Sequence, residues 1–436
     1  MTTVQIERLI SGGWGMTHVG SLVTFVPGSI PGEVLTIASG SMHRGYQMGT
    51  IAKLLETSPD RIEAPCPQYG WCGGCQFQHI KYEAQLRYKQ ALLYEAFTRI
   101  GKVEVPSLSP PIPSPFPFNY RRWVRFAVLP ADPQKGKGAQ LGFHQARTHQ
   151  VVPAANCLLI AESLRMVVHA LQTRLNHVPA LPCRVETVEV RSSLAFGNHL
   201  IQVRGAIEHD YQAQSLFTLL RDIPTVTGIV CVGAKEGPSS RRLRWREGEE
   251  CLYEQFAGSV FRISDRSFMQ ANWPIYEMIF HTIRAWLGVC SQRRVLEAFA
   301  GVGCLGLSLA REGAWVTVVE ENPVALRDAR QSAALNHIRN VRFRHARAER
   351  VFAQVRNEEY DLLLLNPPRG GLTRDGLQAL SRCDCPHVLY LSCDAPALAR
   401  DVAWLCRSGY RLTRLQSFDM FPQTAHLETL VELRRD

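Results

Sequence analysis

From Arg293 onward, short apolar runs alternate with stretches of helical periodicity. The runs read VLEAFA, WVTVVEE, DLLLLNPP and HVLYLSC. Alternation of buried strands with helices builds a parallel sheet with helices on both faces. Residues 263–436 are therefore predicted to form a doubly wound α/β domain. A sheet of this kind binds its ligands beyond the carboxyl ends of the strands, so side chains that follow these runs are the candidates for chemistry.

The rest of the chain differs in pattern and predicts two further domains, in keeping with a length of 436 residues. Residues 1–56 alternate apolar and polar side chains, and the turns Pro27-Gly28 and Pro31-Gly32 punctuate them. This favours a small β-barrel resembling the oligonucleotide/oligosaccharide-binding (OB) type. Residues 57–262 are predicted to form a central α+β domain with a cysteine cluster at its start.

Within the central region, residues 80–100 have helical spacing, and the basic side chains of Lys81, Arg87 and Lys89 are expected on a face toward solvent or RNA. Residues 106–117 contain six prolines and predict an extended linker. A further helix is expected near 161–176. Strands are expected within 121–129, 186–194 and 199–205.

The net charge of +10 favours a polyanionic partner such as nucleic acid. The first ten residues contain no apolar signal core, and no run approaches the ~18 apolar residues of a membrane span. A cytoplasmic protein without membrane contact is expected. The 13 cysteines are then thiols, metal ligands or nucleophiles and not disulfide staples.

A nucleoside site is predicted at the first of the apolar runs. The run VLEAFA leads into Gly301-Val302-Gly303, a turn that lets the backbone approach a ligand at a helix N-terminus. Glu320 ends the next run, at the spacing of an acidic residue that binds ribose hydroxyls. NAD and S-adenosylmethionine both fit this layout. The later Asn366-Pro367-Pro368 turn resembles a motif of methyltransferases and favours S-adenosylmethionine.

Cys393 follows the run HVLYLS, so its thiol is expected in the ligand crevice. A thiolate that adds to carbon 6 of uracil makes carbon 5 nucleophilic toward a methyl sulfonium. A base must then remove the carbon 5 proton, and Glu428 is the candidate. Five other cysteines of this domain are interpreted as packing residues: Cys290, Cys304, Cys383, Cys385 and Cys406.

Together these motifs resemble the RNA 5-methyluridine methyltransferase family over nearly the whole chain. The family's Phe-x-Gln-x-Asn signature stands at Phe268–Asn272, its aromatic residue before the glycine turn at Phe299, and its acidic residue at Glu320. Its Asp-Pro-Pro-Arg-x-Gly motif is similar to Asn366–Gly371, its Ser-Cys-Asn to Ser392–Asp394, and its final His-x-Glu-Thr to His426–Thr429.

The resemblance implies a Rossmann-like fold with Cys393 as nucleophile and Glu428 as base. It places Gln270, Phe299, Glu320 and Asn366 at S-adenosylmethionine. Two residues depart from the family pattern. Asn366 replaces an aspartate, and its amide is expected to fit the N3-H and O4 edge of uracil. Asp394 replaces an asparagine and is expected to raise the pKa of the Cys393 thiol unless Arg369 or Arg400 pairs with it.

A second candidate site is the cysteine cluster. Cys66, Cys72 and Cys75 lie close in sequence, and either the distant Cys157 or His79 could supply a fourth ligand. Such sets suit zinc or an iron–sulfur cluster. In the family that the chain resembles, this spacing with a remote fourth cysteine marks a [4Fe-4S] cluster, which favours Cys157 and a structural role.

RNA is the expected partner. Residues 1–56 resemble the TRAM domain, an RNA-binding barrel, and residues 119–126 interleave arginines with aromatics as in strands that hold phosphates and stacked bases. The target uridine must leave any stack, so loop or single-stranded RNA is expected. We expect a monomeric enzyme acting on 23S rRNA, with tRNA as alternative. The rivals are a small-molecule or protein methyltransferase and an RNA-binding assembly factor with a decayed site.

Overall fold

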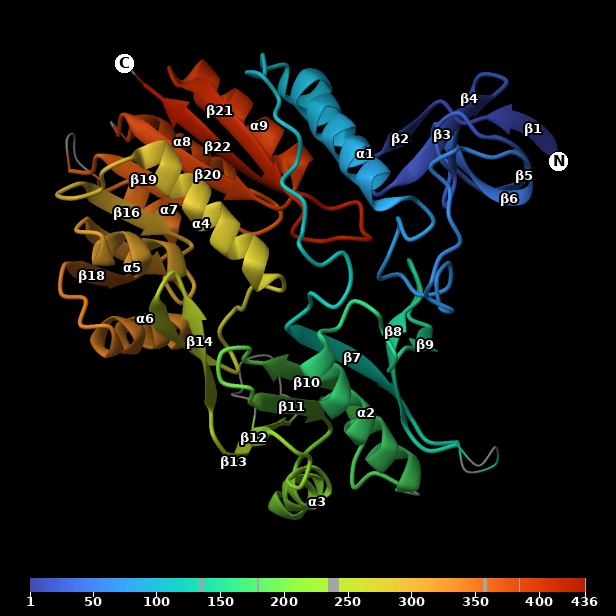
Figure 1. Cartoon of the computed structure of the whole chain (residues 1–436), viewed down its shortest axis with the longest axis horizontal. Helices are drawn as coiled ribbons and strands as arrows, with labels where there is room; N and C mark the ends of the chain where they lie inside the picture. The colour runs from blue at the N-terminus through green and yellow to red at the C-terminus, as the bar shows by residue number, and fades with distance from the viewer. Residues whose placement is uncertain are drawn as a thin grey trace.

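The structure is a computed structural model that describes residues 1–132, 134, 137–178, 180–233, 243–355, 359–383 and 385–435. Figure 1 shows three groups of elements: N-terminal strands, a central sheet with two helices, and a C-terminal sheet covered by helices. Among the described residues, no helix is both long and apolar enough to cross a membrane.

The C-terminal sheet has seven strands in the order β18-β17-β16-β19-β20-β22-β21. Neighbours from β18 to β20 are parallel, whereas β22 is antiparallel to both β20 and β21. The doubly wound sheet is thus confirmed, with one antiparallel strand that the sequence pattern does not announce. The strands are β16 (Arg294–Ala298), β17 (Trp315–Glu320), β18 (Val341–His345), β19 (Leu362–Leu365), β20 (His387–Ser392), β21 (Arg411–Phe418) and β22 (Glu428–Arg434).

Apolar side chains on both faces of this sheet explain its continuous hydrophobic runs. In β19, Leu362 and Leu364 belong to one buried cluster, and Leu363 and Leu365 belong to the other. This division follows the two-residue period of a strand. The first cluster includes residues of α4 (Trp273–Leu287), α5 (Cys304–Arg311) and α6 (Pro323–Leu335); the second includes residues of α7 (Ala348–Phe352), α8 (Arg374–Arg382) and α9 (Ala395–Arg407).

The N-terminal strands form one six-stranded sheet in the order β1-β5-β6-β4-β3-β2, curled around a small apolar core in the barrel-like manner predicted (Figure 1). All neighbours are antiparallel except β4 and β6. Gly28 and Gly32 have positive φ, which explains the Pro-Gly turns between β4 and β5. The strands are β1 (Thr2–Gln5), β2 (Arg8–Ile10), β3 (Trp14–Val19), β4 (Leu22–Val26), β5 (Val34–His43) and β6 (Tyr46–Glu56).

The central sheet has the order β13-β12-β11-β10-β7-β8-β9 and packs against α2 (Glu162–His177) and α3 (Asp210–Leu220). This mixed sheet with two helices matches the predicted α+β domain, and α2 lies within one residue of the helix expected near 161–176. The strands are β7 (Trp123–Leu129), β8 (Gln140–His144), β9 (Val151–Pro153), β10 (Val185–Ser192), β11 (His199–Gly205), β12 (Val226–Val232) and β13 (Arg244–Gly248).

Three connecting segments pack against the C-terminal domain. Helix α1 (Tyr82–Glu95) continues into the π-helix η1 (Ala96–Gly101), which lies on α9. The proline-rich segment runs along β21, where the Ile112 N–H donates to the Ser417 carbonyl at 2.8 Å. The hairpin of β14 (Cys251–Phe256) and β15 (Ser259–Ser264) packs on α6.

The prediction for Lys89 is wrong. Its side chain does not face solvent or RNA but is completely buried, and its ammonium pairs with Asp419 at 2.5 Å. It also donates to the Phe421 carbonyl at 3.0 Å. The reason is that α1 packs on the C-terminal domain along the very face that was expected to be free. Arg87, by contrast, is exposed and pairs with Asp60.

Candidate active site and a cysteine-lined pocket

Cys393 and Glu428 lie on neighbouring strands at the same edge of the C-terminal sheet. Cys393 is the first residue after β20, and Glu428 is the first residue of β22. The register pairs Ser392 with Thr429. Cys393, the residue after Ser392, and Glu428, the residue before Thr429, are therefore opposite each other. The antiparallel β22 is what places a residue from the start of a strand beside the carboxyl end of β20.

The protonation of this pair is set by burial. Glu428 is 3% exposed, and burial raises the pKa of its carboxyl to about 8, against the opposing influence of Arg369. Burial and the neighbouring Glu428 raise the pKa of the Cys393 thiol to about 11, while Arg369 opposes the shift and Asp394 adds to it. A carboxyl with a pKa near neutrality suits a general base.

Asp394 is the N-cap of α9. Its carboxylate accepts a hydrogen bond from the Ala397 N–H at 2.9 Å. Asp394 raises the pKa of Cys393, as expected from the sequence, but less than burial and Glu428 do. Arg400 pairs with Asp401 at 2.7 Å and not with Asp394. Among the described ion pairs, none links Asp394 to Arg369.

The glycine turn lies beyond the carboxyl end of β16. Phe299, Gly301 and Gly303 all have positive φ, and Gly303 is the N-cap of α5. Glu320, the last residue of β17, clamps this turn: its carboxylate accepts from the Gly301 N–H at 2.8 Å and from the Asn322 N–H at 2.7 Å. The expected acidic residue is therefore at the turn, with both oxygens bound to backbone donors.

Asn366 directly follows β19, between the glycine turn and Cys393 in the strand order. Its N–H donates to the Ala298 carbonyl at 3.3 Å, and its side chain is half-buried. Gln270 is 8% exposed and lies just before α4, whose cap is Asn272. Its neighbour Met269 packs in the same apolar cluster as Val302 of the glycine turn.

A cavity of about 280 Å³ opens beside Cys393. Three parts of the chain that are far apart in sequence form it. Sequence motifs could not predict this cavity, because only the folded chain brings the three parts together. The barrel contributes residues from Arg8 to Gly12, α1 and η1 contribute residues from Lys89 to Ile100, and the domain itself contributes Cys393, Asp394 and His426.

Comparisons with known proteins place this geometry in a family. A family model described as tRNA (uracil-5-)-methyltransferase matches residues 249–436. An uncharacterized RNA methyltransferase of Halalkalibacterium halodurans is 31% identical and aligns over 99% of this chain and 96% of its own. The 23S rRNA (uracil(1939)-C(5))-methyltransferase RlmD of Shewanella amazonensis is 32% identical over 98% of this chain and 94% of its own. The chain belongs to the RNA uracil-5-methyltransferase family.

The fold agrees with this membership. The crystal structure of the Pyrococcus abyssi tRNA (uracil-54, C5)-methyltransferase with S-adenosyl-L-homocysteine covers 99% of this chain and 100% of its own, with a TM-score of 0.73 and 21% identity. As a member of this family by sequence, the chain is an S-adenosylmethionine-dependent methyltransferase.

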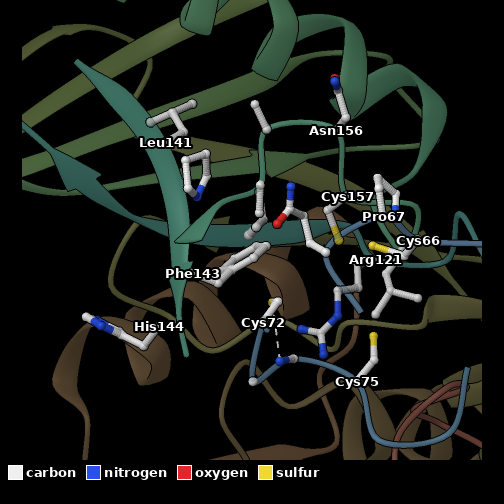
Figure 2. A pocket seen from close by; sticks show the side chains of 18 of the residues that line it. Cys66, Pro67, Cys72, Cys75, Arg121, Leu141, Phe143, His144, Asn156 and Cys157 are labelled. Carbon is white, nitrogen blue, oxygen red and sulfur yellow. Dashed lines mark hydrogen bonds between the residues drawn. The ribbon is translucent and has the colours of Figure 1, made fainter. Parts of the chain in front are cut away.

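This methyltransferase also has a cysteine-lined pocket, about 700 Å³ in volume, between the segment 66–78 and the central sheet (Figure 2). Cys66, Cys72, Cys75 and Cys157 all line it. His79 does not; its Nδ1 is hydrogen-bonded to the Tyr69 hydroxyl. The segment is fixed to β8, because the Gly73 N–H donates to the His144 carbonyl at 3.0 Å.

Two donors point at the sulfur atoms. The Gly74 N–H donates to Cys72 Sγ at 3.4 Å, and Gln78 Nε2 donates to Cys75 Sγ at 3.1 Å. Burial raises the pKa of Cys72, of Cys157 and, to about 12, of Cys75, so without a cation these thiols stay protonated. Among the described residues, no three His, Cys, Asp or Glu side chains are grouped so that they could hold one metal ion.

Four cysteines are a donor set that suits either zinc or an iron–sulfur cluster. Four zinc ligands converge on one ion at ~2.3 Å. A cubane cluster is larger, and its four thiolate ligands bind different iron atoms and stand farther apart. Hydrogen bonds to the sulfurs, as from Gly74 and Gln78, are a usual feature of such clusters.

Proposed function

We propose that this protein transfers a methyl group from S-adenosylmethionine to carbon 5 of a uridine in RNA. The observation that carries the proposal is the pairing of Cys393 and Glu428 at one sheet edge, next to the glycine turn. The 23S rRNA enzyme RlmD, which is 32% identical over nearly the whole chain, supports ribosomal RNA as the substrate. A tRNA substrate is the alternative that the family description favours.

In the proposed mechanism, S-adenosylmethionine supplies an electrophilic methyl group. The Cys393 thiolate forms a bond to carbon 6 of the uracil, and the resulting enolate makes carbon 5 attack that methyl group. Glu428 then takes the proton from carbon 5, and the C–S bond to Cys393 breaks to restore the ring double bond. Arg369 assists, because its positive charge favours both the thiolate and the carboxylate.

Four residues are proposed for cofactor and base recognition. Gln270, Phe299 and Glu320 surround the glycine turn or precede the helix beside it, and they are assigned to S-adenosylmethionine. Asn366 is assigned to the cofactor and to the uracil edge, because it lies between the turn and Cys393 in the strand order. Its neutral amide can both accept from N3-H and donate to O4.

The barrel is proposed to act as a TRAM-type RNA-binding unit. Its β2 end, from Arg8 to Gly12, lines the cavity beside Cys393, so RNA held by the barrel can reach the nucleophile. The exposed Arg99 of η1 lines the same cavity and can contact phosphates. The target uridine enters as a flipped or single-stranded base.

Mass mapping of modified nucleosides in RNA from a deletion strain tests the function. Wild-type protein should restore 5-methyluridine at one position, and Cys393→Ala should not. Restoration by Cys393→Ala would contradict the mechanism. RNA that binds without any methylation by wild-type protein would instead favour an assembly factor with a decayed site.

Glu428→Gln tests the base separately. If Glu428 removes the carbon 5 proton, the variant should methylate RNA once and remain covalently attached to it, which a denaturing gel with labelled RNA would reveal. Turnover at the wild-type rate by this variant would exclude the role of Glu428 and leave Cys393 unaffected.

The four pocket cysteines are proposed to hold a [4Fe-4S] cluster that ties the segment 66–78 to the central domain. The observation that supports it is that Cys66, Cys72, Cys75 and Cys157 line one cavity, with donors aimed at the sulfurs of Cys72 and Cys75. Protein purified without oxygen should contain iron and labile sulfide and absorb near ~400 nm, as thiolate-ligated clusters do. A colourless protein with stoichiometric zinc would overturn this assignment.

A further inference from the structure

Arg121 brings an unbalanced positive charge into the cysteine-lined pocket. Figure 2 shows its guanidinium among the labelled cysteines. It lines this cavity together with Cys66, Cys72, Cys75 and Cys157. Its own backbone is fixed, because its N–H donates to the Leu159 carbonyl at 2.9 Å and its carbonyl accepts from Ala161.

No carboxylate offsets this charge in the described part of the pocket. The described lining residues include neither aspartate nor glutamate, and none of the described ion pairs involves Arg121. The aromatic side chain of Tyr120, whose ring centroid is 5.8 Å from the guanidinium carbon, is its other close partner. A guanidinium placed inside a protein without an anion is unfavourable, which points to a negatively charged occupant of this pocket.

Arg125 lines the same pocket but has a different environment. Its guanidinium pairs with Glu189 at 2.6 Å, and Glu189 also pairs with Arg191 at 2.6 Å. Arg125 therefore already has a carboxylate partner, shared with Arg191, before anything binds. This contrast makes Arg125 a matched control for Arg121.

We propose that Arg121 is the counter-ion of the metal–thiolate group held by Cys66, Cys72, Cys75 and Cys157. The inference rests on the proposed metal site and assigns a role to a residue that the sequence pattern had placed among RNA-binding arginines. Four thiolates give an iron–sulfur cluster a net negative charge, and adding one electron makes it more negative. A nearby fixed positive charge therefore stabilises the reduced form more than the oxidised form.

The test compares Arg121→Gln, Arg121→Lys and Arg125→Gln in full-length protein purified without oxygen. Iron and sulfide content are measured first, and the cluster is then titrated with dithionite while its visible absorbance is followed. Arg121→Gln should disfavour the reduced form by about tenfold, which lowers the midpoint potential by about 59 mV for a one-electron couple. Arg121→Lys and Arg125→Gln should stay within about threefold of wild type.

A wild-type potential and iron content in Arg121→Gln would overturn the inference while leaving the cluster in place. Loss of the cluster from Arg121→Gln alone, with the other two variants loaded and all three equally helical by circular dichroism, would support it. If wild-type protein binds zinc instead, the proposed cluster fails, and the counter-ion role then requires weaker zinc binding by Arg121→Gln. Wild-type protein without any metal would overturn both.

Discussion

At the residue scale, Cys393 and Glu428 are both neutral near pH 7, because burial raises the pKa of the thiol to about 11 and of the carboxyl to about 8. A reaction that needs a thiolate and a carboxylate must therefore recruit positive charge. Arg369 supplies it, since it lowers the pKa of both groups. It is exposed on the Asn-Pro-Pro-Arg loop, so it can respond to bound RNA.

The pH profile of methyl transfer should show this coupling. Both groups must lose a proton, so single-turnover rates should rise with pH through about 8, where Glu428 ionises, and should go on rising less steeply toward about 11, where the Cys393 thiol ionises. Arg369→Gln removes the charge that favours the carboxylate and should move the inflection to higher pH. Arg374→Gln, an exposed arginine at the start of α8, is the control. An unmoved or lowered inflection in Arg369→Gln would contradict the coupling.

Asn366 is a second residue at which a change of charge should alter the rate of methyl transfer. Asn366→Asp would place a carboxylate at the proposed uracil edge and on the same side of the sheet as Glu428, two strands away, where like charges repel. We expect the rate on native RNA to fall by about tenfold, with the loss smaller at low pH, where the new group is protonated. An isotope-labelled methyl donor gives the rates. A several-fold increase in activity would show that the neutral amide is not tuned to this substrate.

At the scale of elements, the buried pair of Lys89 and Asp419 connects α1 to the loop that precedes β22, the strand that begins with Glu428. Lys89→Met leaves the Asp419 carboxylate buried without a cation, which costs about 3–5 kcal/mol. Arg87→Met, at an exposed pair on the same helix, should cost less than about 1 kcal/mol. Thermal unfolding measures both. Equal melting temperatures for the two variants would exclude a structural role for the buried pair.

The same pair shows which parts of the fold a sequence can predict. The strands β16, β17, β19 and β20 follow from continuous apolar runs, because both of their faces are buried locally. The partner of Lys89 does not follow, since Asp419 is 330 residues away and only the docking of α1 brings the two together. The antiparallel direction of β22 and the course of the proline-rich segment along β21 are likewise tertiary outcomes.

The residues of the candidate sites also divide into those that the local sequence predicts and those that only tertiary packing places. Cys393 and Glu428 were recognisable because each directly joins a strand in a motif of fixed order. The positions of Asp394 as a helix cap and of Arg121 among the cysteines were not, because aspartate caps and strand arginines carry no distinguishing local pattern. Their neighbours, and not their own motifs, determine what they do.

At the scale of the whole molecule, the loop between β21 and β22 joins the separate parts. Gln423 bonds to Gln85 of α1 through both its side chain and its backbone, and its carbonyl accepts from Gln76 and Phe77 of the segment after the cysteines. Tyr120, which precedes the central sheet, donates to the Pro422 carbonyl at 3.2 Å. The loop that leads into Glu428 is thus held by α1, by the segment after the cysteines and by a residue that precedes the central sheet.

This arrangement predicts that RNA affinity depends on charges far from the barrel in sequence. Arg99 of η1 is 64% exposed at its side chain and lines the cavity beside Cys393. Arg99→Gln should weaken binding of deletion-strain ribosomal RNA several-fold and reduce the slope of log affinity against log salt by about 0.7, the value for one phosphate contact on a single strand. Filter binding over a range of salt concentrations measures both quantities.

The control for that experiment is Arg339→Gln. Arg339 is exposed just before β18, at the amino ends of the parallel strands and therefore at the opposite edge of the sheet from Cys393. Its removal lowers the net charge by the same amount as Arg99→Gln, so any difference between the two variants reports position and not total charge. Equal salt slopes for both variants would mean that RNA is attracted only by net charge, and the cavity beside Cys393 would lose its assignment as the path of the strand.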